Sequence, residues 1–381
     1  ARELNEYSGA YVKKAYMPHY EQIVLRINPK DIDQFDLVLV RGARIYTSNR
    51  DRPMPMTPPP FAMVLRKHLK NARITGVHQL GFDRVLCFDF DTKFGQYHLY
   101  VEVFRDGNII LTDEKNIIIQ PLTHASYAGR TLKKGVEYQP PPPAMDPHEI
   151  KMEHLVEMFE TSDRDLVSTL GGKVNLGGTH ANAVCALAGM EANIDTQEAD
   201  AQKIHTALQS LLTDLAESKE GFLLLKPDQK NTTESLETQA SKHEPNGKRD
   251  RFFEQFACEA TPTLLPNHEQ FAKATFPTLC QAVDAWKGAH DAMALARREA
   301  EKLDIAAPGR GHSTDVERLE RRQVQQEKAL KGFSVKIEKQ QMLGHVIQNN
   351  WTHVESLLTQ VSAAVEEKGW SQVKKDAKEI P

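Results

Sequence analysis

The sequence predicts an α+β protein built around a mostly antiparallel sheet that carries helices. Two observations predict this class. Short apolar or alternating stretches, separated by turn residues, fill most of residues 1–145 and are typical of strands joined by hairpins. From about residue 146 onward, apolar residues recur mainly at helical spacing. With 381 residues, of which 40% are apolar, the chain can bury a substantial core over two or three domains.

The first lobe, residues 1–145, is expected to hold most of the sheet. After the end of a helix near Gly9, four stretches have the composition of strands: residues 11–16, 22–27, 35–40 and 43–47. A proline-rich approach then leads into a short amphipathic helix that begins at Phe61. One long strand is expected from Val77 to Phe90, because its residues alternate in polarity. Two further strands close the lobe across a turn at Gly107 and Asn108: residues 97–104 and 109–112.

The helix that begins at Phe61 is predicted to have one apolar face and one cationic face. Apolar residues recur every four positions, and the cations fall on the remaining surface: Arg66, Lys67, Lys70 and Arg73. Four arginines precede the helix, at positions 41, 44, 50 and 52, and Asp51 and Asp83 are the only acidic residues between Arg41 and Arg84. Because the whole chain has a net charge of −4, this positive charge is local. It predicts a surface for a polyanion.

Asp83 and Arg84 are a second candidate contact for nucleic acid. Neighbouring residues on a strand point to opposite faces, so the two side chains cannot form a simple local ion pair there. Two interpretations remain open. Asp83 caps the turn after Gly81 while Arg84 lies on the surface, or the pair binds a nucleotide, since Arg forks onto phosphate or a base edge and Asp accepts from base amino groups.

A proline run after Gln139 marks a domain boundary, since proline lacks the amide donor and fixes φ. A helical domain is expected over residues 146–216. Its predicted helices run from Asp146 or Pro147 to Met158, from a cap at Ser162 to Leu170, and over residues 201–216.

Two glycine pairs lie inside this helical domain, at residues 171–172 and 177–178. The second pair opens directly into a predicted helix, so the amides of Gly177 and Gly178 face outward at the positive end of that helix, with Lys173 nearby. This pattern indicates a helix-hairpin-helix element that binds a phosphate. The alternative is that the glycines merely permit a tight turn between packed helices.

The remaining chain is expected to form two segments. Residues 217–286 continue the first domain as a mixed α and β segment, with a strand that begins at Phe222 and a polar loop over residues 228–250. Residues 287–381 are rich in Ala, Glu, Lys, Arg and Gln with a thin apolar seam, which is typical of an antiparallel coiled-coil arm.

Common catalytic and metal signatures are absent from the sequence. No GxxxxGK[ST], HExxH, GxSxG or GxGxxG occurs, so we expect no catalytic residue and no cofactor. The four cysteines show no CxxC, and four histidines (68, 78, 98 and 124) lack paired spacing, so they would become metal ligands only by tertiary coincidence. No apolar run has the length of a membrane helix, and we expect a cytoplasmic setting.

Four motifs occur in order along the chain: residues 59–69 (PPFAMVLRKHL), 81–85 (GFDRV), 107–113 (GNIILTD) and 176–182 (LGGTHAN). Together they resemble those of the NFACT family of ribosome quality-control factors, which includes prokaryotic proteins labelled fibronectin-binding. The resemblance covers essentially the whole chain. It implies an NFACT-N head similar to formamidopyrimidine glycosylases, a helix-hairpin-helix insert and the start of the family's coiled-coil arm.

The resemblance also implies a function. Members bind the large ribosomal subunit that still carries an obstructed peptidyl-tRNA, and recruit charged tRNA to extend the nascent chain without mRNA, with alanine in prokaryotes. The family's Asp-Arg pair falls on Asp83 and Arg84 and is implicated in tRNA engagement, while peptidyl transfer belongs to the ribosome. The chain lacks the family's acidic residue near the true start and its RNA-binding NFACT-R domain, so we expect an N-terminal fragment.

Two rival functions belong to other classes. A DNA-binding or glycosylase-like repair protein is suggested by the shared fold, but such glycosylases use an N-terminal proline amine, and Ala1 offers none. A surface fibronectin-binding adhesin is suggested by the older label, but no signal sequence or paired cysteines support it.

Overall fold

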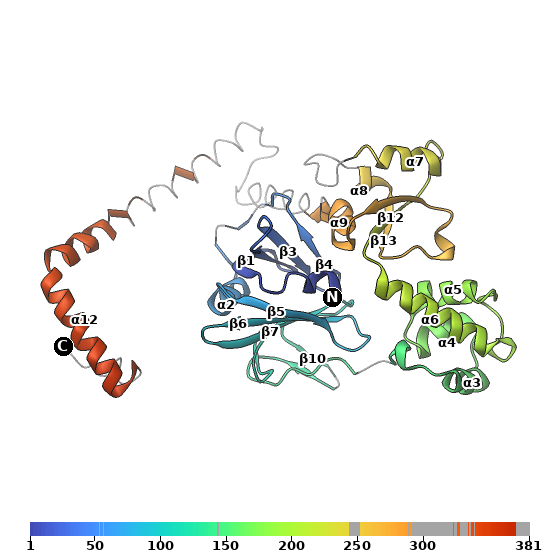
Figure 1. Cartoon of the computed structure of the whole chain (residues 1–381), viewed down its shortest axis with the longest axis horizontal. Coiled ribbons are helices and arrows are strands. Elements are labelled where there is room, and N and C mark those ends of the chain that lie inside the picture. Colours follow the sequence, from blue (N-terminus) through green and yellow to red (C-terminus); the bar gives the residue numbers. More distant parts are fainter. Residues whose placement is uncertain are drawn as a thin grey trace, which may run out of the picture. The chain divides into compact units, whose positions relative to one another are not determined.

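The computed structural model describes two compact units, Ala1–Glu299 and Ala300–Pro381 (Figure 1). The described residues are 1–52, 54–55, 57–127, 129–142, 145–243, 252–288, 290–291 and 340–370, with isolated residues between 323 and 338. The finer division at residues 145, 216 and 286 stays a prediction.

A nine-stranded sheet dominates the first unit, in the order β4-β3-β2-β1-β5-β6-β7-β8-β9. Every paired neighbour in it is antiparallel. This confirms the predicted α+β class with a large antiparallel sheet. The strands are β1 (Tyr11–His19), β2 (Gln22–Asn28), β3 (Phe35–Val40), β4 (Arg44–Ser48), β5 (Arg73–Gln79), β6 (Val85–Thr92), β7 (Gly95–Glu102), β8 (Ile109–Asp113) and β9 (Ile118–Pro121).

Helix α2 (Pro60–Leu69) lies between the two halves of this sheet in the chain and packs against β1. Its apolar face is buried as predicted, with Phe61, Leu65 and Leu69 in the main core. The helix ends at Leu69, and Asn71 turns the chain with a φ of 58°. Arg73 therefore belongs to β5 rather than to the helix, which corrects the predicted cationic face.

The prediction of one long strand from Val77 to Phe90 is wrong. Residues 80–84 form a turn between β5 and β6, closed by a 3.0 Å hydrogen bond from the Leu80 amide to the Val85 carbonyl. Gly81 has a φ of 55°, a left-handed conformation that interrupts a strand. Alternation of polarity continues across this turn, so the sequence pattern alone does not reveal it.

A helical region with its own core follows. It comprises η1 (Pro147–Glu149), α3 (Met152–Thr161), α4 (Leu166–Lys173), α5 (Gly177–Leu187), η2 (Thr196–Glu198) and α6 (Ala201–Glu217). The expected first helix is broken, because Ile150 is extended and separates η1 from α3. The expected cap at Ser162 is also wrong: Asp165 caps α4 by accepting from the Ser168 amide, whereas the Ser162 hydroxyl bonds to Thr169.

A three-stranded antiparallel sheet forms a third core in the first unit, with the order β13-β12-β14. Its strands are β12 (Gly221–Leu225), which was predicted, and β13 (Ala257–Thr261) and β14 (Ala272–Phe276), which were not. The region also contains α7 (Thr233–Ala240), α8 (Phe252–Phe256), η3 (Pro266–His268), α9 (Leu279–Val283) and the π-helical turn η4 (Asp284–Gly288). The described residues of the unit also form helix α1 (Arg2–Asn5) and the hairpin of β10 (Ala125–Ser126) and β11 (Thr131–Leu132).

Helix α7 overturns part of the loop expected over residues 228–250. Thr232 caps it by accepting from the Ser235 amide, and Leu236 and Ala240 are buried one turn apart. Two buried residues on one face of a short helix are too few to reveal that helix from the sequence of a polar segment. Residues 244–250 of that loop lie outside the described residues.

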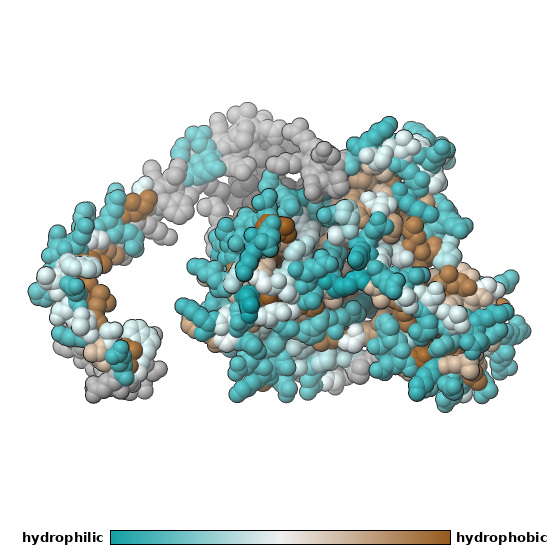
Figure 2. All heavy atoms as spheres, in the orientation of Figure 1, coloured by the Kyte–Doolittle hydropathy of each residue, from teal (hydrophilic) through white to brown (hydrophobic). Residues whose placement is uncertain are grey.

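The second unit is described mainly through helical residues 340–349 and α12 (Trp351–Lys368). Hydrophobic residues are visible at the surface of this segment in Figure 2. The exposed apolar side chains are Met342, Leu343, Val346, Ile347, Trp351, Leu357 and Leu358. Most of residues 292–339 lies outside the described residues, so the coiled-coil arm stays a prediction. Among the helices that the structure describes, none is long and apolar enough to cross a membrane.

Candidate nucleic-acid interface

The Asp83–Arg84 pair lies in the β5–β6 turn. The Asp83 carboxylate accepts a 2.7 Å hydrogen bond from the Arg84 amide, and the Gln79 side chain donates to the Asp83 carbonyl at 2.8 Å. Asp83 thus stabilises the turn, as one of the two open interpretations expected. Arg84 is exposed, and its guanidinium has no hydrogen bond or ion pair within the described part of the chain. It is therefore free to bind an anion.

A hollow of about 280 Å³ adjoins this pair. Its wall is mainly apolar, with Leu86 and Val103 beside the sheet and Leu279, Cys280 and Val283 from α9. Asp83 and Arg84 contribute the polar part of the lining together with Gln79 and Glu3. The Glu3 carboxylate accepts from the Cys280 amide, which fixes the start of α9 against α1. An apolar hollow with a cation and a carboxylate in its lining suits a planar polar group such as a nucleobase.

The turn also contacts the helical region. The Asn175 side chain donates a 3.1 Å hydrogen bond to the Phe82 carbonyl across 93 positions of sequence. The Phe82 ring packs against the helical core and meets His148 edge-on, with 5.5 Å between ring centroids. Phe82, His148 and Asn175 were not predicted to belong to the site. The structure therefore brings the turn with Asp83 and Arg84 into contact with the link that precedes the second glycine pair.

Asn175 lies in the link between α4 and α5, two residues before the second glycine pair. Gly177 begins α5 with a φ of 65°, and no side chain caps this helix start. Lys173, Gly177 and Gly178 are all exposed. The first glycine pair lies within the last turn of α4 rather than in the link. Exposed, uncapped amides at a helix start next to a lysine are suited to binding a phosphate.

The cations of α2 have different surroundings from one another. Lys67 and Lys70 are exposed. The Arg66 guanidinium donates to the Ala15 carbonyl at 2.7 Å and lies 5.3 Å from the centre of the Tyr16 ring. Arg73 pairs with Asp91 at 3.7 Å, and both side chains are about half exposed. The predicted cationic face is thus divided between α2 and the start of β5.

The arginines before α2 are mostly bound internally. Arg41 donates to the Gly107 carbonyl at 2.8 Å. Arg44 and the Tyr46 hydroxyl bind Asp291, while Arg50 and Arg52 surround the buried Asp284, at 3.2 and 3.7 Å. Burial raises the pKa of the Asp284 carboxyl, and the two guanidiniums oppose this shift. Arg44, Arg50 and Arg52 anchor the segment from η4 to Asp291 on β4 and the residues that follow it. With Arg41 also bound internally, the four arginines contribute less to a polyanion surface than their number in the sequence predicts.

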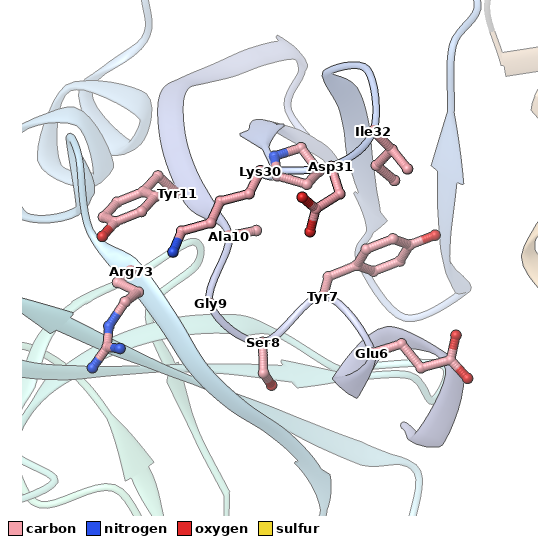
Figure 3. Close-up of a pocket in the computed structure, with 11 residues that line it drawn as sticks. Glu6, Tyr7, Ser8, Gly9, Ala10, Tyr11, Lys30, Asp31, Ile32 and Arg73 are labelled. Carbon is pink, nitrogen blue, oxygen red and sulfur yellow. The ribbon is translucent and has the colours of Figure 1, made fainter.

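A second hollow, of about 420 Å³, lies beside Gly9 at the junction of β1 and β5. Figure 3 shows Tyr11, Lys30 and Arg73 around one side of it, with Tyr7 and Glu6 on the other. Only Arg73 among these residues was a predicted contact. The mixed charges of the lining do not favour one class of ligand.

Comparisons with known proteins agree with the motifs. Residues 1–368 match the family model described as NFACT N-terminal and middle domains. The archaeal Rqc2 homolog aRqcH of Methanocaldococcus jannaschii is 26% identical over 389 residues, covering 99% of this chain and 53% of that protein. The ribosome quality control complex subunit NEMF of Homo sapiens is 25% identical over 381 residues, covering 96% and 33%. The chain spans about half the length of the archaeal relative and a third of the human one.

Among solved structures, the fibrinogen binding protein from Staphylococcus aureus is similar in fold. The TM-score is 0.52 at 18% identity, with 74% of this chain and 94% of that chain covered. At this level of identity the likeness concerns the fold alone.

Proposed function

Because the chain belongs to the NFACT family, we propose that it acts in ribosome-associated quality control. In this proposal it binds the obstructed large ribosomal subunit with its peptidyl-tRNA-blocked nascent chain. It then recruits a tRNA, an alanine tRNA, for mRNA-independent C-terminal tailing of that chain. The names of its archaeal and human relatives support the quality-control role.

The observation that best supports the tRNA part of the proposal is the contact between the β5–β6 turn and the α4–α5 link. The exposed Arg84 lies one residue from Asp83 and two from Phe82, whose carbonyl is bound by Asn175 of the α4–α5 link. Arg84 binds the RNA backbone or a base edge, and Asp83 holds the turn that presents it. The amides of Gly177 and Gly178, with Lys173, bind a second phosphate of the same RNA.

Further backbone contacts come from the exposed cations of α2 and its surroundings. Lys67 and Lys70 extend into solvent, while Arg66, Arg73 and Arg41 are partly engaged within the protein and contribute less. The factor is non-catalytic and cytoplasmic in this proposal, with the helix-hairpin-helix insert and the coiled-coil arm as additional contacts for the ribosome. Peptidyl transfer is left to the ribosome.

The test compares the affinity of the 381-residue chain for alanine tRNA, a non-cognate tRNA and a DNA duplex at two salt concentrations. In the Asp83→Ala/Arg84→Ala variant we expect tRNA affinity to fall by about 5- to 100-fold, corresponding to roughly 1–3 kcal/mol. Loss of one phosphate contact would also lower the salt slope by about 1.

The matched control is Arg105→Ala/Asp106→Ala, which removes an exposed Arg–Asp pair from the loop between β7 and β8. We expect it to bind tRNA like the wild type. If both double variants behave alike, or if tRNA and DNA bind equally, the β5–β6 turn is not a tRNA site.

A further inference from the structure

Four chemically active side chains converge on one face of the large sheet, outside the interface described above. His78 of β5 pairs with Cys87 of β6, and Asp89 of β6 pairs with His98 of β7. Since Cys87 and Asp89 are two residues apart on one strand, they point to the same face. The cross-strand pairs place both histidines on that face too.

Two distances in this cluster, to the two oxygens of the Asp89 carboxylate, are close to those between ligands of a tetrahedral metal ion. His78 Nδ1 lies 3.2 Å from Asp89 Oδ2, and Cys87 Sγ lies 3.5 Å from Asp89 Oδ1. Around a tetrahedral Zn²⁺, usual bond lengths give separations of about 3.4 Å for nitrogen to oxygen and about 3.6 Å for sulfur to oxygen. One ligand atom from each of His78, Cys87 and Asp89 lies within 4.8 Å of the other two. Small side-chain rotations therefore suffice to bring the three onto one ion.

His98 has a different position in the cluster. Its Nδ1 lies 2.6 Å from Asp89 Oδ1, which is a hydrogen-bond distance and too short for two ligands of one ion. The hydrogen bond fixes the orientation of the Asp89 carboxylate. Burial acts to raise the pKa of Asp89, but the hydrogen bond from His98 and the nearby His78 outweigh it, so the pKa is lowered.

The surroundings of the cluster differ on its two sides. Cys87 is 1% exposed and packs with Tyr100 and Tyr138 in a small apolar cluster. The His78 side chain is 53% exposed. An ion held by the three ligands would thus have protein on one side and a fourth position open to water. The Tyr100 hydroxyl donates to Asn116 at 2.7 Å and also interacts with the Cys87 thiol, so it lies beside the proposed site.

We propose that His78, Cys87 and Asp89 form a binding site for a divalent transition metal, best suited to Zn²⁺, in which His98 orients the Asp89 ligand. One sulfur, one nitrogen and one oxygen ligand match the preferences of Zn²⁺. A hydrogen-bonded partner behind a ligand is usual at such sites. The sequence did not predict this site, because its ligands come from two strands and have no motif spacing. The proposal is independent of any role in ribosome quality control.

Metal binding replaces the proton of the Cys87 thiol, which leaves to solvent as the zinc–sulfur bond forms. Burial, and after it the neighbouring Asp89, raise the pKa of this thiol, so the metal competes with a firmly held proton. Because this proton must leave, metal affinity is expected to rise with pH. A bound ion would join β5 to β6 at the end nearer their turn, and would stabilise the folded chain.

The test titrates the chelator-treated 381-residue chain with Co²⁺ and then displaces it with Zn²⁺. We expect one equivalent of Co²⁺ to give the visible bands of a tetrahedral site and a near-ultraviolet thiolate-to-cobalt charge-transfer band. Zn²⁺ should abolish both and raise the melting temperature. Absence of the charge-transfer band in the wild type would overturn the proposal.

Variants assign the ligands. Cys87→Ser should lose the charge-transfer band, whereas Cys258→Ser, at an exposed thiol elsewhere, should keep it. His78→Gln should abolish stoichiometric binding, and His124→Gln, also at an exposed histidine, should not. His98→Gln should keep the spectrum and weaken affinity by about 10- to 100-fold. If Cys87→Ser does not fold, the test rests on the exposed His78. Equal metal binding by His78→Gln and His124→Gln would then overturn the proposal.

Discussion

The buried charges around Asp284 illustrate how a residue's neighbours decide its role. Arg52 is 8% exposed and lies close to Asp284, which also contacts Arg50. In the sequence these arginines look like part of a polyanion surface, because the carboxylates that bind them come more than 230 positions later. Asp83 and Arg84 could be proposed from the sequence as contact residues, since their motif is local. Phe82 and Asn175 could not, because their importance depends on a contact that only the folded chain creates.

His268 gives a prediction at the same scale. The ring is 1% exposed, and its Nδ1 accepts from the Leu265 amide at 3.1 Å, so it is held in the neutral form. Burial lowers its pKa, with Lys273 and His180 acting in the same direction and Glu259 against them. The unfolded chain therefore binds more protons below the ordinary value of 6.5, and stability falls as the pH falls through that value.

We expect the free energy of unfolding of the wild type to fall between pH 7 and about pH 5. Protonation of His268 contributes at most about 1.4 kcal/mol per pH unit to this fall. His268→Asn keeps an acceptor for the Leu265 amide and should lose less over the same range. Urea unfolding at several pH values measures this, with His124→Asn as the exposed control. The prediction fails if the two variants show the same pH dependence.

At the scale of elements, the link between α4 and α5 depends on backbone conformation. Gly177 has a φ of 65°, which a β-branched residue adopts only with strain, although a Cβ there would meet no atom within 4 Å. Gly178 is equally open in space but has no positive φ. Substitutions at Gly177 and Gly178 therefore distinguish a requirement for a positive φ from a requirement for space around the Cβ.

Gly177→Val should reduce the free energy of unfolding by about 1–2 kcal/mol, since the left-handed conformation disfavours a side chain with a branched Cβ. Gly178→Ala should leave it nearly unchanged. Urea unfolding followed by circular dichroism compares the two. Equal stability of both variants would mean that the link shifts to an ordinary conformation without cost.

The strands differ in how well the sequence predicts them. The strands of the large sheet were largely predictable, because each has its own apolar pattern and turn. The β5–β6 turn was missed because polarity alternates through it. Strands β13 and β14 were missed because short segments such as ACEAT and AKATF become strands only by pairing with β12 on both its edges.

At the scale of the whole first unit, the large sheet and the helical region have separate cores, and the β5–β6 turn joins them. The join consists of the Asn175 hydrogen bond to the Phe82 carbonyl and the packing of the Phe82 ring on the helical core. A further hollow, different from the two described above and lined by Phe82, His148 and Leu212, lies at this contact, so the packing around the ring is incomplete. A small contact of this kind lets motions of the two cores be coupled through one residue.

Phe82→Ala should therefore loosen both sides of the join without unfolding either core. We expect amide hydrogen exchange to accelerate in residues 80–84 and, together with them, in residues 174–177, because the shared ring and carbonyl position both segments. Asn175→Ala should have the same effect to a smaller degree, since one partly exposed hydrogen bond contributes about 0.5–1.5 kcal/mol. Mass spectrometry of exchanged peptides measures this.

The control is Phe94→Ala, which removes a ring that is 75% exposed from the neighbouring β6–β7 turn. It should accelerate exchange in neither segment. If Phe82→Ala loosens residues 80–84 alone, the turn and the α4–α5 link act independently, and the RNA contacts proposed for Arg84 and Gly177 would belong to separate sites. Acceleration in both segments would instead mean that the two motifs form one preorganised surface, because a ligand held by either would restrict the other.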